Sequence, residues 1–475
     1  MQSDKKVLFE ETPIMSALMQ LAIPTVMGQI ILVIYNMADT FFISLTDSND
    51  KITAVTVCMP AFMFLSAIAN LFGIGGSSVM SRALGKQNIE RVRHTSAFSF
   101  WGCLVAVLLY AIFILAILDP FVDFLGGSAP GVHTYAREYV TITIIVCGLF
   151  TAMNSLTSHL VRSTGMAVHA SVGVILGGIL NILLDPLFMF HLLPPGKEVV
   201  GAAIATGLSN MISCLYFLAL LAICRRRGNT LISLKLTRSS FEGKIPSNVF
   251  NAGLPAFVMT FAENFSYAIL DNLLSVYGTA VQAGIGVAKK INMLSHSIVR
   301  GITQGALPLI GYNYSAGNRV KTRRIVWTVG LVTVGTASVC TLSMLVFSDF
   351  FVGIFLDSGN LSKEFGMKFL RILCIGAPFS ALAYTFISFF QAVGHGLESF
   401  KLAILRKGAL DIPMMFILRN VLSMYGIVAS TPIVDIICSL VAVFLFLSFA
   451  SDHLEANKKR KVYNARKGYY EVEGS

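Results

Sequence analysis

The sequence predicts an all-α integral membrane protein: twelve transmembrane helices in two six-helix bundles, related by a pseudo-two-fold axis along the membrane normal. Hydrophobic side chains make up 55% of the 475 residues and charged ones only 13%, which is more apolar material than a soluble core can use. Apolar stretches of about 20 residues, the length needed to cross the hydrocarbon layer, recur along the whole chain. Landmarks of the first half also return in the second. Together these observations favour a duplicated membrane bundle.

Twelve apolar stretches account for the predicted spans. They cover residues 17–44, 52–83, 95–118, 134–162, 167–192, 199–224, 246–277, 280–312, 325–349, 365–393, 400–420 and 425–450. Several exceed the minimum length, which indicates tilt or kinks. The predicted units are an N-terminal six-helix lobe over 1–224, a cytoplasmic linker over 225–245, a C-terminal six-helix lobe over 246–450 and a partly disordered cytoplasmic tail over 451–475.

Basic residues predict the orientation of the chain. The formal net charge is +11, but the Lys and Arg residues lie in short loops between apolar stretches, so we expect no nucleic-acid partner. The basic loops follow the second, sixth and eighth spans, and such loops remain in the cytoplasm. We expect a multi-pass, monomeric protein of the bacterial cytoplasmic (inner) membrane, surrounded by membrane lipids, with both termini cytoplasmic.

The sequence lacks the motifs of intramembrane enzymes. HExxH and GxSxG do not occur, and the eight cysteines form no CxxC pair, so they are interpreted as buried thiols. We expect no enzyme activity, no catalytic residue and no cofactor, and no metal site beyond one for a monovalent cation.

Four landmarks recur in the same order, 226 to 232 residues later. Tyr35-x-x-x-Asp39 returns as Tyr267-x-x-x-Asp271, Gly85 as Gly317, Arg162-Ser-Thr-Gly165 as Gln391-Ala-Val-Gly394, and Asp185 as Asp411. Because each repeat holds an even number of spans, both halves enter the membrane in the same direction and are related by an axis along its normal. Paired bundles of this kind fit alternating access around a central site.

Two acids lie well inside predicted spans of the first half. Asp39 is ~8 Å and Asp185 ~10 Å of helix rise from the outer ends of their spans, and intramembrane acids usually serve a function. Thr206 and Tyr139 fall at a similar depth, and Asn181 precedes Asp185 by one helical turn. These oxygens suit a monovalent cation or a shared proton, since two carboxylates held close cannot both ionise at neutral pH. The alternative is that Asn181 and Asp185 only join helices.

Other polar residues within spans are candidates for a hinge or a substrate cavity. Pro24 cannot donate to the helix ladder, so it predicts either a hinge in the helix that carries Asp39 or a static kink. The cavity candidates are Gln29, Asn36, Glu263, Asp271 and Asp411. The candidate partners of the second-half acids are Lys289, Lys290, Lys368, Arg371, Arg406 and Lys407, although several of them lie close enough to a span end to snorkel to a membrane surface.

The landmarks resemble those of the multidrug and toxic compound extrusion (MATE) family. They are Pro24 and Asp39, then GKQNIERVRH, RSTG, NILLDPLFMF and GAAIAT. The later QAVGHG is most similar to the MepA-like bacterial branch. The resemblance implies secondary active efflux of small cationic or amphipathic organic compounds, a multidrug activity, by antiport against protons or sodium ions.

The same resemblance assigns residues to an ion site. It implies that Asp39, Asn181, Asp185 and Thr206 hold the coupling cation or proton, with Tyr35 and Tyr139 as weaker matches. Glu263 matches an acid of the sodium-coupled branch, but the second acid that this branch carries in its tenth span is missing here. The alternative function is a flippase-like exporter of a lipid-linked or metabolite substrate. Such a protein needs a cationic cavity, and the interior acids argue against it.

Overall fold

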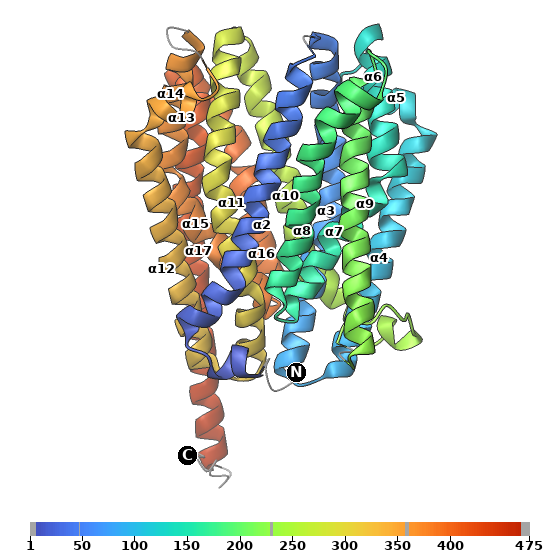
Figure 1. Cartoon of the computed structure of the whole chain (residues 1–475). Coiled ribbons are helices and arrows are strands. Elements are labelled where there is room, and N and C mark those ends of the chain that lie inside the picture. The colour runs from blue at the N-terminus through green and yellow to red at the C-terminus, as the bar shows by residue number, and fades with distance from the viewer. Residues whose placement is uncertain (1–5, 47, 229–230, 357–360, 467–475) are drawn as a thin grey trace.

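The structure is a computed structural model that describes residues 6–46, 48–228, 231–356 and 361–466, and these residues form a helical bundle without strands (Figure 1). The first half contains η1 (Val7–Glu11), α2 (Ile14–Ser44), α3 (Asn49–Gly85), α4 (Ile89–Ala116), α5 (Leu118–Phe124), α6 (Pro130–Val140), η2 (Thr141–Val146), α7 (Gly148–Ser163), α8 (Ala167–Pro186), η3 (Leu187–Leu192) and α9 (Glu198–Arg226). The second half contains η4 (Arg238–Phe241), α10 (Ile245–Ser275), α11 (Thr279–Ser315), α12 (Arg319–Val346), α13 (Ser348–Gly353), α14 (Leu361–Ile375), α15 (Ala377–Val393), α16 (Gly396–Ile404), η5 (Leu405–Ala409) and α17 (Asp411–Arg466).

The described helices accommodate all twelve predicted spans. Seven helical segments are long and apolar enough to cross a membrane, and two bent pairs, 131–163 and 361–393, raise this number to nine. α10 and α11 carry more polar residues but run beside these spans (Figure 1). The segment 396–451 contains the last two spans, because the backbone leaves helical geometry at Ser423 (φ 54°) and the chain then doubles back.

One predicted feature of the chain stays untested, and one predicted boundary differs in the structure. Pro24 lies inside the continuous helix α2, so its role as a hinge stays a prediction. α17 continues to Arg466, where a partly disordered tail was predicted from residue 451, and residues 467–475 lie outside the described part of the chain.

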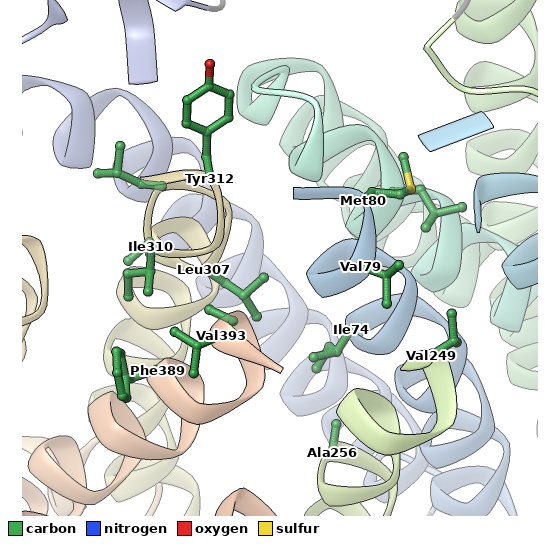
Figure 2. Close-up of a cluster of buried hydrophobic side chains, with 14 of the residues drawn as sticks. Ile74, Val79, Met80, Val249, Ala256, Leu307, Ile310, Tyr312, Phe389 and Val393 are labelled. Atoms are coloured by element: carbon green, nitrogen blue, oxygen red, sulfur yellow. The ribbon is translucent and has the colours of Figure 1, made fainter. Parts of the chain in front are cut away.

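The two lobes share one hydrophobic core near the end of the bundle that carries both termini, here called the terminal end. This core joins Ile74 and Met80 of the first half to Val249 and Leu307 of the second (Figure 2). At the opposite end, here called the far end, each lobe has a separate core. The lobes are therefore closed against each other at the terminal end and independent at the far end.

Glycines make this closure tight. A Cβ atom on Gly253 of α10 would overlap the carbonyl of Leu71 on α3, and a Cβ on Gly301 of α11 would lie 2.6 Å from the Cα of Val26 on α2. Only glycine permits backbones to approach so closely. The N-terminal segment adds a contact across the lobes, since Phe9 stacks on Tyr312 of α11 with ring centroids 4.9 Å apart.

Candidate functional site

Four polar residues predicted for the ion site converge in the first lobe, from helices α2, α8 and α9. Asp185 is 0% exposed, and Asn181, one turn earlier on α8, is also buried. The Nδ2 atom of Asn181 donates to Asp185 Oδ1 at 3.3 Å and to Thr206 Oγ1 at 3.2 Å. The carboxyl group of Asp39 on α2 lies within hydrogen-bonding reach of Asp185 and Asn181. We call Asp39 and Asp185 the acid pair.

The acid pair holds buried oxygens that have no donor. Asp39 Oδ1, Asp185 Oδ2 and Asn181 Oδ1 make no hydrogen bond in the structure, although buried polar atoms are normally satisfied. No Lys or Arg among the described residues forms an ion pair with either acid. Three oxygens that converge without a donor or a counter-ion can accept a proton or coordinate a monovalent cation.

The two predicted tyrosines surround this group. Tyr35 lies one turn before Asp39 on α2, and Tyr139 reaches it from α6; both are close enough to interact electrostatically with the two carboxyl groups. The predicted neighbour Asn36 donates instead to the carbonyl of Leu32 at 2.6 Å. Asn36 therefore does not contribute to the acid pair.

A cavity of about 220 Å³ lies between the lobes, next to the acid pair. It is lined by α2, α3, α7, α8, α9, α10 and α11, and its polar lining includes Gln29, Asn36, Asn70, Asn154, Asn210 and Gln304. Of the predicted cavity residues, Gln29, Asn36 and Glu263 lie in this lining. Asp271 and Asp411 do not, so the structure separates these two acids from the cavity.

The charged lining of the cavity differs from the expectation of interior acids. Glu263 is its one carboxylate among the described residues, and Arg162 and Arg300 are its strong cations. Arg300 on α11 forms an ion pair with Glu263 at 3.3 Å, and Tyr384 donates to the same carboxylate at 3.3 Å. Glu263 therefore already has a counter-ion within the protein, and its attraction of cationic compounds stays a prediction.

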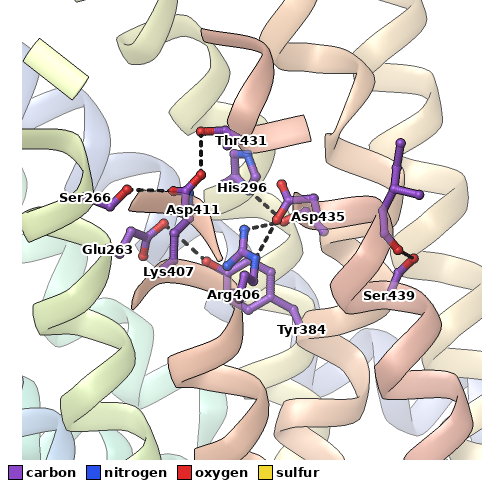
Figure 3. A network of polar contacts seen from close by, with 12 residues as sticks. Glu263, Ser266, His296, Tyr384, Arg406, Lys407, Asp411, Thr431, Asp435 and Ser439 are labelled. Carbon is purple, nitrogen blue, oxygen red and sulfur yellow. Dashed lines mark hydrogen bonds and ion pairs between the residues drawn. The ribbon is translucent and has the colours of Figure 1, made fainter. Parts of the chain in front are cut away.

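Asp411 and Asp435 of the second lobe belong to a buried network of paired charges (Figure 3). Arg406, 1% exposed, donates to Asp435 Oδ1 at 2.7 Å and to Ser380 Oγ at 2.7 Å. Lys407 contacts Asp411 Oδ2 at 3.1 Å. Ser266 and Thr431 complete the shell of the Asp411 carboxylate, at 2.6 and 3.3 Å.

This network agrees with one expectation from the sequence and corrects another. Arg406 and Lys407 are partners of second-half acids, because the π-helical turn η5 directs both side chains into the lobe and not to a membrane surface. Asp271 is 48% exposed at its side chain and pairs with Lys289 of α11, so it has no counterpart of the Asp39 contact. The network residue Asp435 and the cavity residue Arg162 were not predicted as site residues; a basic pair four residues before an acid inside an apolar stretch was the available signal for the network.

Comparisons with known proteins agree with this architecture. The MatE family model matches residues 24–187 and again 255–417. The multidrug export protein MepA of Staphylococcus aureus (strain MSSA476) is 25% identical over 448 residues, 94% of this chain and 96% of that protein. MepA of Staphylococcus haemolyticus (strain JCSC1435) is 26% identical over the same shares of the two chains.

Solved structures share the fold. The crystal structure of a MATE protein in complex with MaL6 superposes with a TM-score of 0.87 at 23% identity, covering 95% of this chain and 99% of that one. A multidrug resistance MATE family transporter in an outward-facing conformation gives 0.84 at 23% identity, covering 95% and 98%. With a family model that matches both halves, the chain belongs to the multidrug and toxic compound extrusion family, MatE, whose members are membrane transporters of small molecules and not enzymes.

Proposed function

We propose that this chain exports amphipathic organic compounds by antiport, and that the acid pair of the first lobe binds the coupling proton or sodium ion. The observation that carries the proposal is the set of three buried oxygens without a donor, on Asp39, Asn181 and Asp185. A site with two carboxyls and no internal cation is stable only when it takes up positive charge from outside. The names of the MepA relatives support multidrug compounds as the exported class.

The proposed mechanism uses the two-lobe architecture. The shared core and the close glycine contacts close the terminal end, whereas the far end has separate cores. We infer from this difference that the cavity and the acid pair face the far end in this state. Ion uptake at the acid pair changes the charge within the α2, α8 and α9 contact, and we infer that this change favours the state in which the terminal end opens.

We propose that the terminal end faces the cytoplasm of a bacterium, so that the far end faces outside. The support is the basic composition of the segment between α9 and α10 and of the loops after α3 and α11, all at the terminal end. Ser239→Cys between α9 and α10 and Ser128→Cys between α5 and α6 are exposed positions for a labelling test. An impermeant thiol reagent added to intact cells should label only the Ser128→Cys protein. Labelling of the Ser239→Cys protein from outside would reverse the orientation.

The coupling proposal is tested in liposomes that contain the purified full chain. Accumulation of a fluorescent amphipathic compound is measured under a pH gradient at equal sodium, and under a sodium gradient at equal pH. We expect one of these gradients to drive accumulation, and Asp185→Asn to abolish it. Asp119→Asn, an exposed acid on α5 that pairs with Arg137, is the matched control and should transport normally. Equal accumulation without either gradient would contradict antiport.

A flippase-like exporter of a lipid-linked or metabolite substrate is the second candidate. One observation favours it: the cavity contains two arginines and one glutamate, so its net charge is positive. Such a protein would move a phosphate-bearing lipid analogue between leaflets of the same liposomes without an ion gradient.

A further inference from the structure

Arg162 is a buried cation in the cavity wall that lacks an acidic partner. It lies in the last turn of α7, is 3% exposed and lines the cavity between the lobes. Its Nη1 atom contacts His159 Nδ1 at 3.1 Å, and its Nε–H has no acceptor. Among the described residues, no Asp or Glu forms an ion pair with Arg162, whereas the buried cations Arg406 and Lys407 pair with Asp435 and Asp411, and the partly buried cavity residue Arg300 pairs with Glu263.

An unpaired guanidinium inside a membrane protein is costly. Charged side chains at membrane depth pair with one another or line a polar cavity that supplies their partner, and a buried charge whose partner is removed destabilises a protein strongly. Because Arg162 lines the cavity, a group inside the cavity can supply its partner. The missing partner is then a group of the transported compound.

The neighbouring side chains extend this polar surface. Asn154, two turns earlier on α7, donates to Asn210 Oδ1 at 2.9 Å, and its own Oδ1 atom has no donor. Ser155 and Ser158 lie on the same stretch of the cavity lining. One end of the cavity thus offers a cation, hydroxyls and an unsatisfied amide oxygen, while Phe62, Met63 and Leu65 of α3 supply apolar lining.

We propose that Arg162 forms an anion subsite, and that the compounds this chain prefers carry an acidic group on an apolar body. A carboxylate, sulfonate or phosphate meets the fork of a guanidinium in two parallel hydrogen bonds, which gives both affinity and orientation. This inference rests on the proposed export function and narrows its substrate class from amphipathic compounds in general to zwitterionic or anionic ones. The acid pair does not oppose it, because Asp39 and Asp185 lie outside the cavity lining.

A matched pair of dyes tests the subsite in the wild-type chain. Rhodamine B carries a free carboxylate and its ethyl ester does not, while the cationic ring system is the same. Binding to the full chain in lipid nanodiscs is measured by fluorescence anisotropy, with empty nanodiscs subtracted. We expect rhodamine B to bind about tenfold more tightly, the effect of one charged hydrogen-bonded pair. Equal or tighter binding of the ester would overturn the proposal without any variant.

Variants of Arg162 test whether this residue causes the preference for rhodamine B over its ester. Arg162→Gln should remove the tenfold preference by weakening rhodamine B alone, and Arg162→Lys, which keeps the charge but loses the fork, should retain part of it. Arg137→Gln, an exposed arginine outside the cavity, is the control and should leave both affinities unchanged. If Arg162→Gln does not fold, the test is whether Arg162→Lys lowers the preference for rhodamine B. A loss of affinity for both dyes in equal proportion would mean that Arg162 only supports the fold.

Transport measurements separate this inference from the proposed function. If rhodamine B binds more tightly than its ester but neither dye accumulates under a gradient, the anion subsite is supported and antiport is rejected. Gradient-driven accumulation of both dyes at equal rates, with equal affinities, would leave antiport and reject the subsite. Movement of a fluorescent phospholipid analogue in place of rhodamine B would assign Arg162 to a lipid headgroup and overturn the preference for small acidic compounds.

Discussion

The two lobes place acids at matching positions but surround them differently. In the first lobe, Asp185 has an amide one turn earlier, Asn181, and a second carboxyl from Asp39. In the second lobe, the residue one turn before the equivalent Asp411 is Lys407, and its amine contacts the Asp411 carboxylate. The acid equivalent to Asp39 is Asp271, which pairs with Lys289 at an exposed position.

The two lobes therefore differ in whether their buried acids are neutralised by cations of the protein. The second lobe balances three buried acids with three cations, namely Glu263 with Arg300, Asp435 with Arg406 and Asp411 with Lys407. The acid pair of the first lobe has no Lys or Arg paired with it among the described residues, and three oxygens of Asp39, Asn181 and Asp185 have no donor. Both lobes thus carry an acid at the equivalent position, but the residue one turn earlier is an amide in the first lobe and an amine in the second. We propose that this change makes only the first lobe dependent on an ion from outside.

Removal of either carboxyl of the acid pair should have the largest effect. Asp39→Asn and Asp185→Asn each abolish gradient-driven accumulation, because one carboxyl alone cannot alternate between a charged and a neutral pair. Both proteins should still reach the membrane and bind rhodamine B. The double variant should be no worse than either single one, since the two residues act as a unit. Accumulation against a gradient in both single variants would require a different coupling site.

Transfer of the second-lobe pattern into the first lobe should be almost as severe. Asn181→Lys places an amine one turn before Asp185, as Lys407 stands before Asp411. The amine supplies the positive charge that the ion would bring, so gradient-driven accumulation should fall to background while the folded yield is preserved. Asn181→Gln, which adds length without charge, is the control and should retain part of the activity. Normal transport by the Asn181→Lys protein would contradict the proposed difference between the two lobes.

In the second lobe the expected effect is on stability. Asp435→Asn leaves the guanidinium of Arg406 buried without its partner, which should cost about 3–5 kcal/mol. Replacement of both residues together, Arg406→Met with Asp435→Leu, should cost less because no charge remains. Thermal unfolding in detergent gives the order of the two variants. A double variant less stable than the single one would show that the pair itself stabilises the lobe.

Glu263→Gln should change affinity more than coupling. The substitution frees Arg300 from its counter-ion within the cavity, so rhodamine B should bind about fivefold more tightly. Gradient-driven accumulation should persist. The matched variant Glu198→Gln, an acid that pairs with Lys51 away from the cavity, should change neither. Loss of ion coupling in Glu263→Gln would place an ion site in both lobes.

The smallest expected effect is at Thr206. Thr206→Val removes the hydroxyl that accepts from Asn181 Nδ2 at 3.2 Å and keeps the shape of the side chain. We expect the apparent affinity for the coupling ion to fall about threefold, the value of one neutral hydrogen bond. Ion titration of transport measures this shift. Thr333→Val, a hydroxyl that bonds within α12 and to α15, is the control in the other lobe.

The spacing of residues in the sequence was enough to predict part of the site. Asn181 and Asp185 share a helix face because four residues make about one turn, and Thr206 and Asp39 fall at the same depth when the spans are counted from their ends. The contacts of Asn181 with Asp185 and Thr206 agree with that prediction. The pairing of Glu263 with Arg300 could not be predicted in this way, because Arg300 lies 37 residues away in the sequence and faces Glu263 only when α10 and α11 come together.

The sequence by itself determined the membrane class, the number of spans and the duplication, because apolar length and helical periodicity are local properties of the chain. It also indicated which acids lie inside the membrane. Tertiary structure decided which of these acids are neutralised. Lys407 pairs with Asp411 because the π-helical turn η5 directs its side chain into the lobe, whereas no Lys or Arg of the described residues forms an ion pair with Asp185. Charge balance in a membrane interior is a sum over neighbours in space, so only the packed helices show that Arg162 faces the cavity without an acid beside it.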